Sequence, residues 1–234
     1  MKIALRKTGV AVLVAGLSTG MLSAHAADSF NINVTGVISP AACEASIAGG
    51  EVIDYGHIPT QSLSPDEMTL LAPRTTGFTV VCQAPTKLGF QATDNRMSTR
   101  LTDNSTVITL GNGAVWTPLF MHGLGTDSKG NKIGGWAASL TQTTLDTTAN
   151  PIAMYTTTGG ILWREYPNKI LNFLDRPDQK TIYAFSQPDA LSPVAFRTLS
   201  ATLDVQAMIA PASTLDLSQP VTLDGSVTVE MVYL

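Results

Sequence analysis

The stretch Asp224-Gly225-Ser226-Val227-Thr228-Val229-Glu230-Met231-Val232-Tyr233-Leu234 decides the fold class of this chain. Apolar side chains occupy alternate positions from Val227 to Tyr233, which is the period of a β-strand with one buried face. A second alternating stretch, Phe30-Asn31-Ile32-Asn33-Val34-Thr35-Gly36-Val37-Ile38, lies near the other end. The last strand runs to Leu234 without a polar tail, so we expect another chain to complete this sheet edge.

Short alternating runs separated by Gly, Asn and Asp clusters recur along the sequence, whereas no sustained helical repeat is visible. The pattern predicts one all-β sandwich domain over 27–234, with a loop excursion over about 122–158, which is rich in Gly, Thr and Asn. Strands are expected near 30–38, 51–55, 75–83, 87–93, 105–110, 115–121, 160–165, 181–186, 196–209 and 222–233.

The first 26 residues have the three parts of a secretory signal. Lys2, Arg6 and Lys7 precede an apolar run over 10–22, and the small-residue site Ala24-His25-Ala26 follows. We expect cleavage after Ala26 and an exported mature chain. No later segment approaches the about 20 consecutive apolar residues of a membrane-spanning helix.

The chain has two cysteines, Cys43 and Cys82. In an oxidising compartment they are expected to form a disulfide, and the alternative is a pair of unrelated buried thiols. Two cysteines with the scattered His57 and His122 show no zinc-ligand spacing, so we predict no metal site.

The charge balance limits the partners of the chain. Lys and Arg number 14 against 18 Asp and Glu, and removal of residues 1–26 lowers the formal net charge from −4 to −7. Such a chain is not expected to bind nucleic acid or an anionic membrane through its charge. A hydrophobic content of 44% argues against a largely disordered chain.

We find no reactive constellation that indicates an enzyme. The sequence lacks a Gly-x-Ser-x-Gly elbow, a His-Glu-x-x-His helix and a Gly-rich phosphate loop. His57 and His122 could pair with acids such as Asp54 or Asp127, but two isolated histidines are weak evidence. We therefore predict neither catalysis nor a cofactor, and a periplasmic hydrolase is the least favoured class.

Four motifs, in order after the signal, resemble the subunits of chaperone–usher pili. Val34-Thr35-Gly36-Val37-Ile38-Ser39-Pro40-Ala41-Ala42-Cys43 resembles their first strand, and Val52-Ile53-Asp54-Tyr55-Gly56-His57-Ile58 resembles their next segment. Thr79-Val80-Val81-Cys82 resembles the strand with the second half-cystine. Asp224 to Leu234 is similar to the C-terminal strand with its penultimate Tyr. The resemblance covers mainly the first third and the last tenth of the mature chain.

The resemblance implies an immunoglobulin-like sandwich that lacks its last strand. A hydrophobic groove would then run beside the C-terminal strand, lined by Val227, Val229, Met231 and Tyr233, with the Leu234 carboxylate bound by basic residues of a periplasmic fimbrial chaperone. At the outer-membrane usher, a strand from a neighbouring fimbrial subunit would replace the chaperone. The alternative is an ordinary edge strand in a complete sandwich.

The segment before the first strand indicates where such a subunit would lie in the fibre. Phe30, Ile32 and Val34 alternate well enough to be a donor strand for a neighbour, or they belong to the first strand. The short segment 27–34 and the enlarged region 95–175 favour a minor or tip subunit displayed at the cell surface.

Tryptophans are the candidates for ligand binding, since a sugar ring packs its apolar face on an indole. Trp136, between Gly135 and Ala137 in the expected excursion, is the possible contact for a host or surface glycan, although Trp residues of β-proteins are more often core residues. The alternative function is a self-contained periplasmic or secreted β-sandwich that binds carbohydrate.

Overall fold

The computed structural model describes residues 35, 42–166, 169–176 and 179–234. The chain divides into two units, residues 1–38 and 39–234, and every strand described below belongs to the second. The predicted signal segment 1–26 lies outside the described residues. So do Phe30, Ile32 and Val34, the candidate donor residues.

The described chain is all-β, as the sequence predicts, and every strand pairing in it is antiparallel. The strands are β1 (Cys43–Ile47), β2 (Thr69–Leu70), β3 (Arg74–Asp94), β4 (Ile108–Thr109), β5 (Val115–Trp116), β6 (His122–Gly123), β7 (Gly134–Leu145), β8 (Thr148–Ala149), β9 (Ile152–Thr156), β10 (Arg164–Glu165), β11 (Leu171–Asn172), β12 (Ile182–Ser186), β13 (Ala195–Ile209) and β14 (Val227–Tyr233). Short 3₁₀ turns are η1 (Thr60–Ser62), η2 (Met97–Thr99), η3 (Pro118–Phe120) and η5 (Ala212–Thr214).

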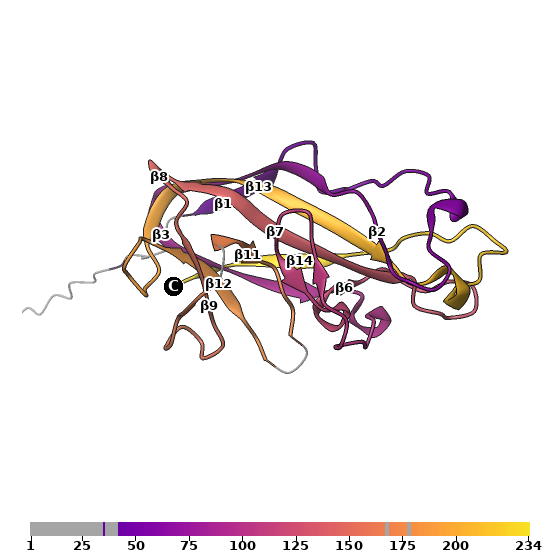
Figure 1. The fold of residues 1–234 in the computed structure, drawn as a ribbon. Coiled ribbons are helices and arrows are strands. Elements are labelled where there is room, and N and C mark those ends of the chain that lie inside the picture. The colour runs from indigo at the N-terminus through magenta and orange to yellow at the C-terminus, as the bar shows by residue number, and fades with distance from the viewer. Residues whose placement is uncertain (1–34, 36–41, 167–168, 177–178) are drawn as a thin grey trace, which may run out of the picture. The chain divides into compact units, whose positions relative to one another are not determined.

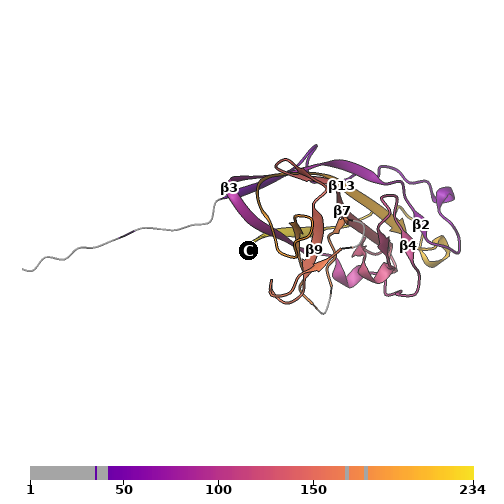
Figure 2. The ribbon, with the colours of Figure 1, turned by 60° about the vertical axis from the view of Figure 1, so that its left-hand side comes forward.

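One curled sheet contains most of these strands, and β3 passes through both of its halves. The first half of β3 lies between β1 and β13, and its second half lies between β14 and β12. Figure 1 shows β3 reaching the left-hand end of the domain, turning there and returning below, and Figure 2 shows the same turn from another side.

The turn of β3 coincides with a break in its pairing to β13. The register shifts between Phe196/Thr86 and Thr198/Val81, so several β3 residues oppose a single β13 residue. Pro85 lies within this break and has no backbone N–H to donate to a neighbouring strand. The bulge bends the strand, which lets one continuous segment join the two halves of the sheet.

The main core fills the space between the two halves. Phe78 and Val80 come from the first half of β3, whereas Phe90 and Ala92 come from the second, and all four are buried. The Phe78 and Phe90 rings meet edge to face with centroids 6.1 Å apart. Burial of such aromatic side chains stabilises the curled arrangement by about 1.5–3 kcal/mol each.

The structure differs from the sequence-based expectation in the middle of the chain. The predicted excursion over about 122–158 contains β7, which pairs with β13 over ten register positions, and β9, which pairs with β12. Gly134 and Gly135 begin β7, where neighbouring atoms come too close for a side chain. A Cβ placed on Gly134 would lie only 2.0 Å from the Met208 carbonyl oxygen. The small residues therefore indicate close packing between strands here, and not a loop.

Residues 51–55 also depart from the expectation, because they pair with no described strand. They follow Gly49 and Gly50, whose φ angles of 80° and 95° turn the chain after β1. The predicted strands over 75–83 and 87–93 form the single strand β3, and the expected strands around 108 and 116 are the short pair β4–β5.

The Cys43–Cys82 disulfide predicted from the sequence is present. The two residues are directly opposite in the β1–β3 register, so the bond fixes the first residue of β1 to the sheet. Within the described ranges, no helix has the length and apolar character needed to cross a membrane.

We expect the Cys43→Ala/Cys82→Ala variant to be less stable by about 4 kcal/mol, because a cross-link over 39 residues restricts the unfolded chain. Urea unfolding of oxidised wild type and variant, followed by near-ultraviolet circular dichroism, measures the difference. Equal midpoints for the two proteins would contradict this role of the bond.

Candidate binding groove between β1 and β14

The structure has a groove of about 460 Å³ between β1 and β14. One wall consists of β1 and the segment that follows it, and the other wall is β14. The floor is apolar and belongs to the core. It is lined by Phe78, Phe90, Ala138, Phe173, Leu203 and Val205.

The β14 wall presents an unpaired backbone edge to the groove. Asn95 donates its backbone N–H to the Ser226 carbonyl, and Leu234 donates its N–H to the Lys87 carbonyl. Because an antiparallel ladder alternates, the odd-numbered residues of β14 direct their backbone groups away from β3. No other described strand pairs with this edge.

Of the five residues predicted to form the groove, three line it and two do not. Val227, Val229 and Met231 line the groove, and Val229 is 37% exposed. Tyr233 and Leu234 lie beyond the lining residues and remain about 40% exposed. Alternate apolar side chains next to open backbone groups are the features that an added strand requires.

The β1 wall has the same property. Its even-numbered residues bond to β3, since Ala48 donates its N–H to Gly77 and Gln83 donates its N–H to Ala42. Ala45 and Ile47 therefore direct their backbone groups to the groove side, and among the described strands β1 pairs with β3 alone.

Tyr55 holds the extension of the β1 wall, Glu51 and Ile53, against the sheet. Its hydroxyl accepts the Ala207 N–H at 3.0 Å and donates to the Val205 carbonyl at 3.1 Å. Burial of the phenol raises the pKa of Tyr55, so the hydroxyl keeps the proton that it donates. The Arg74 guanidinium lies 5.5 Å from the ring centroid and covers its outer face.

The two walls meet at one end of the groove through Tyr233. Its hydroxyl accepts the backbone N–H of Cys43 at 3.1 Å, which connects the end of β14 to the beginning of β1. An added strand can therefore lie along Val227 to Met231 but meets this contact at Tyr233.

Trp136 from β7 lies at the other end, below the beginning of β14. Its indole N–H donates to the Gly123 carbonyl at 3.2 Å, and the ring is partly buried. A Cβ on Gly225 would lie 2.6 Å from the indole nitrogen, so only glycine fits there. The Asp-Gly pair that precedes the last strand thus allows close packing on a tryptophan.

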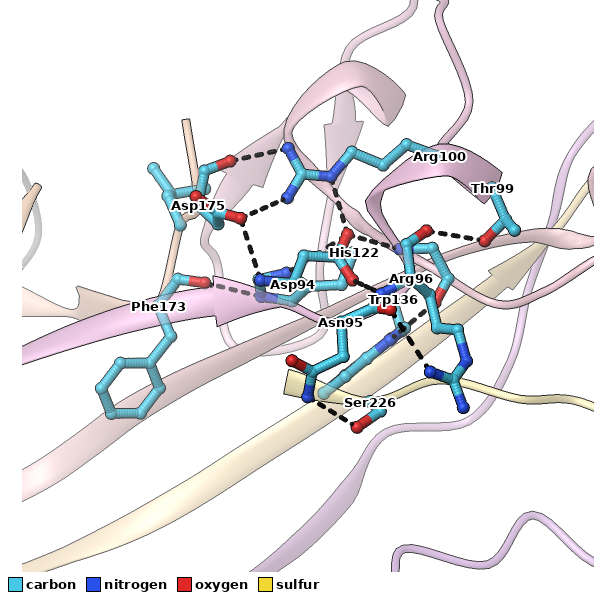
Figure 3. A network of polar contacts seen from close by, with 12 residues as sticks. Asp94, Asn95, Arg96, Thr99, Arg100, His122, Trp136, Phe173, Asp175 and Ser226 are labelled. Atoms are coloured by element: carbon cyan, nitrogen blue, oxygen red, sulfur yellow. Dashed lines mark hydrogen bonds and ion pairs between the residues drawn. The ribbon is translucent and has the colours of Figure 1, made fainter. Parts of the chain in front are cut away.

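A buried network of charged side chains supports this end of the groove (Figure 3). Asp94, the last residue of β3, accepts from Arg100 Nε at 2.8 Å and from the Gly123 N–H at 3.0 Å. Arg100 also donates to the Asp175 carbonyl at 2.7 Å, and Asp175 accepts the Asp94 N–H at 2.9 Å. These bonds compensate for burial of the charges, which is unfavourable when a charge lacks a partner.

Outside the buried part, the network continues to β14. Asn95 donates to the Ser226 hydroxyl at 2.9 Å and to the Thr228 hydroxyl at 3.1 Å. The Arg96 guanidinium donates to both Asp224 oxygens, at 2.8 and 2.9 Å. The end of β3 therefore fixes the beginning of the groove strand.

His122 lies behind two groove-lining residues. Its Nε2–H donates to the Phe173 carbonyl at 2.7 Å, and its ring centroid is 5.0 Å from that of Trp136. Nδ1 has no hydrogen bond and is 4.0 Å from Asp94 Oδ2. Burial lowers the pKa of His122 to about 4, so the neutral imidazole predominates near neutral pH.

Other candidate residues from the sequence analysis are buried or hold local structure. His122 lies next to Asp94. Asp127 accepts the backbone N–H groups of Lys129 and Asn131 in its own loop, and also that of the distant Asp216. Trp116 and Trp163 are buried. In the part of the chain that is described, no three His, Cys, Asp or Glu side chains converge as metal ligands would.

Comparison with known proteins gives relatives without an assigned activity. A family model described as "Protein of unknown function (DUF1120)" matches residues 32–137. The chain is similar to the uncharacterized protein YhcF of Escherichia coli (strain K12), with 25% identity over 244 residues that cover 96% of this chain and 99% of YhcF. It is also similar to the protein GltF of the same organism, with 26% identity over 247 residues and 96% coverage of each. No solved structure matches.

Sequence analysis missed the residues that shape the groove from behind. Tyr55 belongs to the motif over 52–58, but its position next to β13 depends on the tertiary fold. Asp94 and Arg100 are six residues apart in a polar turn cluster, and nothing in that pattern indicates burial. The one sequence feature that could have indicated this buried pair is the cluster of charged residues at 94–100, at the end of the long strand β3.

We expect Tyr55→Phe to lower the free energy of unfolding by about 1–3 kcal/mol, because the Ala207 N–H and the Val205 carbonyl lose their shared partner. Tyr155→Phe is the matched control, since the Tyr155 hydroxyl takes part in none of the hydrogen bonds found among the described residues. Chemical denaturation of both variants measures the difference, and equal losses would refute the anchoring role.

His122 also predicts a pH dependence of stability. Its folded-state pKa lies below the unfolded value of 6.5, so the unfolded chain binds the proton first and stability falls as pH decreases from about 6.5 to about 4. His122→Gln keeps a donor for Phe173 and removes the titration. We therefore expect a shallower pH dependence for this variant in that window. Parallel curves of unfolding free energy against pH would contradict the assignment.

Proposed function

We propose that this chain is a non-enzymatic structural or adhesive subunit of a chaperone–usher fimbria, assembled by donor-strand complementation. The observation that carries the proposal is an apolar groove bordered on both sides by strand edges, β1 and β14, that have no second partner among the described strands. An exposed edge over a hydrophobic floor favours aggregation unless another strand covers it.

The geometry supports an immunoglobulin-like sandwich that lacks one strand. Both layers share β3, and the missing strand would lie between β14 and the wall formed by β1 and Glu51–Ile53. An added strand gains backbone hydrogen bonds along the odd-numbered residues of β14. Its alternate side chains contact Val227, Val229 and Met231.

In this proposal, a periplasmic fimbrial chaperone fills the groove during transport, and a neighbouring subunit replaces it at the outer-membrane usher. The candidate donor residues Phe30, Ile32 and Val34 would serve a different subunit in the fibre. A short donor segment and the enlarged central region favour a minor or tip position at the cell surface. Carbohydrate binding by a complete, self-contained sandwich is the competing function.

Co-expression separates these two functions. The exported chain is produced in a periplasm with and without a fimbrial chaperone that carries a purification tag, and its yield and co-elution are measured. The proposal predicts a stable complex and little soluble protein without the chaperone. A good yield of a cooperatively folding, chaperone-free monomer would instead indicate a complete sandwich and overturn the proposal.

Within that experiment, Val229→Asp places a charge in the apolar groove, so we expect at least a tenfold loss of chaperone complex with unchanged export. Tyr233→Asp is expected to act in the same direction, because it removes the contact with Cys43 as well. Val115→Asp is the matched control, since Val115 is 59% exposed on β5 and does not line the groove. Complex formation by Val229→Asp at the wild-type level would argue against the groove.

A further inference from the structure

We infer that the strand filling the groove belongs to a basic partner surface, with a Lys or Arg side chain opposite Glu51. This inference rests on the proposed function and specifies the chemistry of the partner. Its first support is that Glu51 lines the groove and is exposed. A partner that covers the β1 wall must therefore either pair with this carboxylate or leave it in water.

The charges along the two open strands have one sign. Glu44 on β1 and Glu230 on β14 are exposed, and neither they nor Glu51 take part in an ion pair among the described residues. Glu44 and Glu230 alternate along their strands with apolar residues that line the groove. Their side chains therefore lie on the outer faces of β1 and β14. We call Glu44, Glu51 and Glu230 the acidic rim.

Two basic side chains near the groove already have partners, whereas the rim carboxylates form no ion pair among the described residues. Arg96 forms a two-bond ion pair with Asp224, and Arg74 lies over the Tyr55 ring. The groove therefore offers an apolar floor, open backbone groups and uncompensated negative charge. A strand with alternating apolar and basic side chains is complementary to all three features.

The acidic rim should act mainly on the rate of encounter. Exposed charges attract an oppositely charged partner over about 10 Å at about 0.1 M salt and over longer distances at lower salt, so added salt screens the attraction. An acidic strand with the same apolar side chains would meet repulsion from the rim, so the rim also selects between strands of equal hydrophobicity.

Two fluorescent peptides test the inference. They share Val, Ile and Phe at alternate positions and carry either Lys or Glu between them. The exported full chain is unfolded in urea and diluted into buffer that contains one peptide, and anisotropy records association. We expect the Lys peptide to associate about tenfold faster at low salt, with the difference shrinking toward unity near 0.5 M NaCl.

Rim variants identify the source of the difference. Glu44→Gln/Glu51→Gln/Glu230→Gln should abolish the preference for the Lys peptide, and Glu51→Gln alone should reduce it. Glu165→Gln on β10 is the control and should leave it unchanged. Equal association of both peptides with wild type, or an unchanged preference in the triple variant, would overturn the charge inference while the groove stands. Binding of neither peptide would overturn the proposed function itself.

Discussion

The continuity of β3 through its turn at Pro85 is the constraint on which the arrangement depends. One edge of this strand carries β1 before the turn and β14 after it, so a single bend places the two strands on opposite sides of the same space. The edge that faces the other way carries β13 and then β12. Because both halves belong to one strand, the walls of the groove cannot separate without breaking the core between Phe78 and Phe90.

The groove is held open by contacts at its two ends and behind its wall. Tyr233 joins the walls near the turn, Tyr55 fixes the extension of β1, and the Asp94 network fixes the beginning of β14. These contacts are hydrogen bonds and ion pairs, which specify direction better than apolar packing does. The apolar floor can therefore remain accessible without collapse of the walls.

The similarity to YhcF and GltF extends over nearly the whole chain, so the unassigned relatives provide a comparison for this geometry. The features to seek in them are the glycine just before the last strand, the tyrosine that joins that strand to the first one, and the buried Asp–Arg pair at the end of the long strand. These three features come from distant parts of the sequence, and their joint presence would indicate a shared groove.

The sequence by itself determined the all-β class, the Cys43–Cys82 bond and the alternating apolar face of the last strand, because these follow from local period and from having only two cysteines. It misjudged 122–158, since small residues that allow strands to pack closely look the same in sequence as loop residues. Only the tertiary structure decided that Trp136 lies under Gly225 and that Asp94, Arg100 and Asp175 share a buried site. Those contacts join residues far apart along the chain, and local pattern carries no information about which distant residue fills a given space.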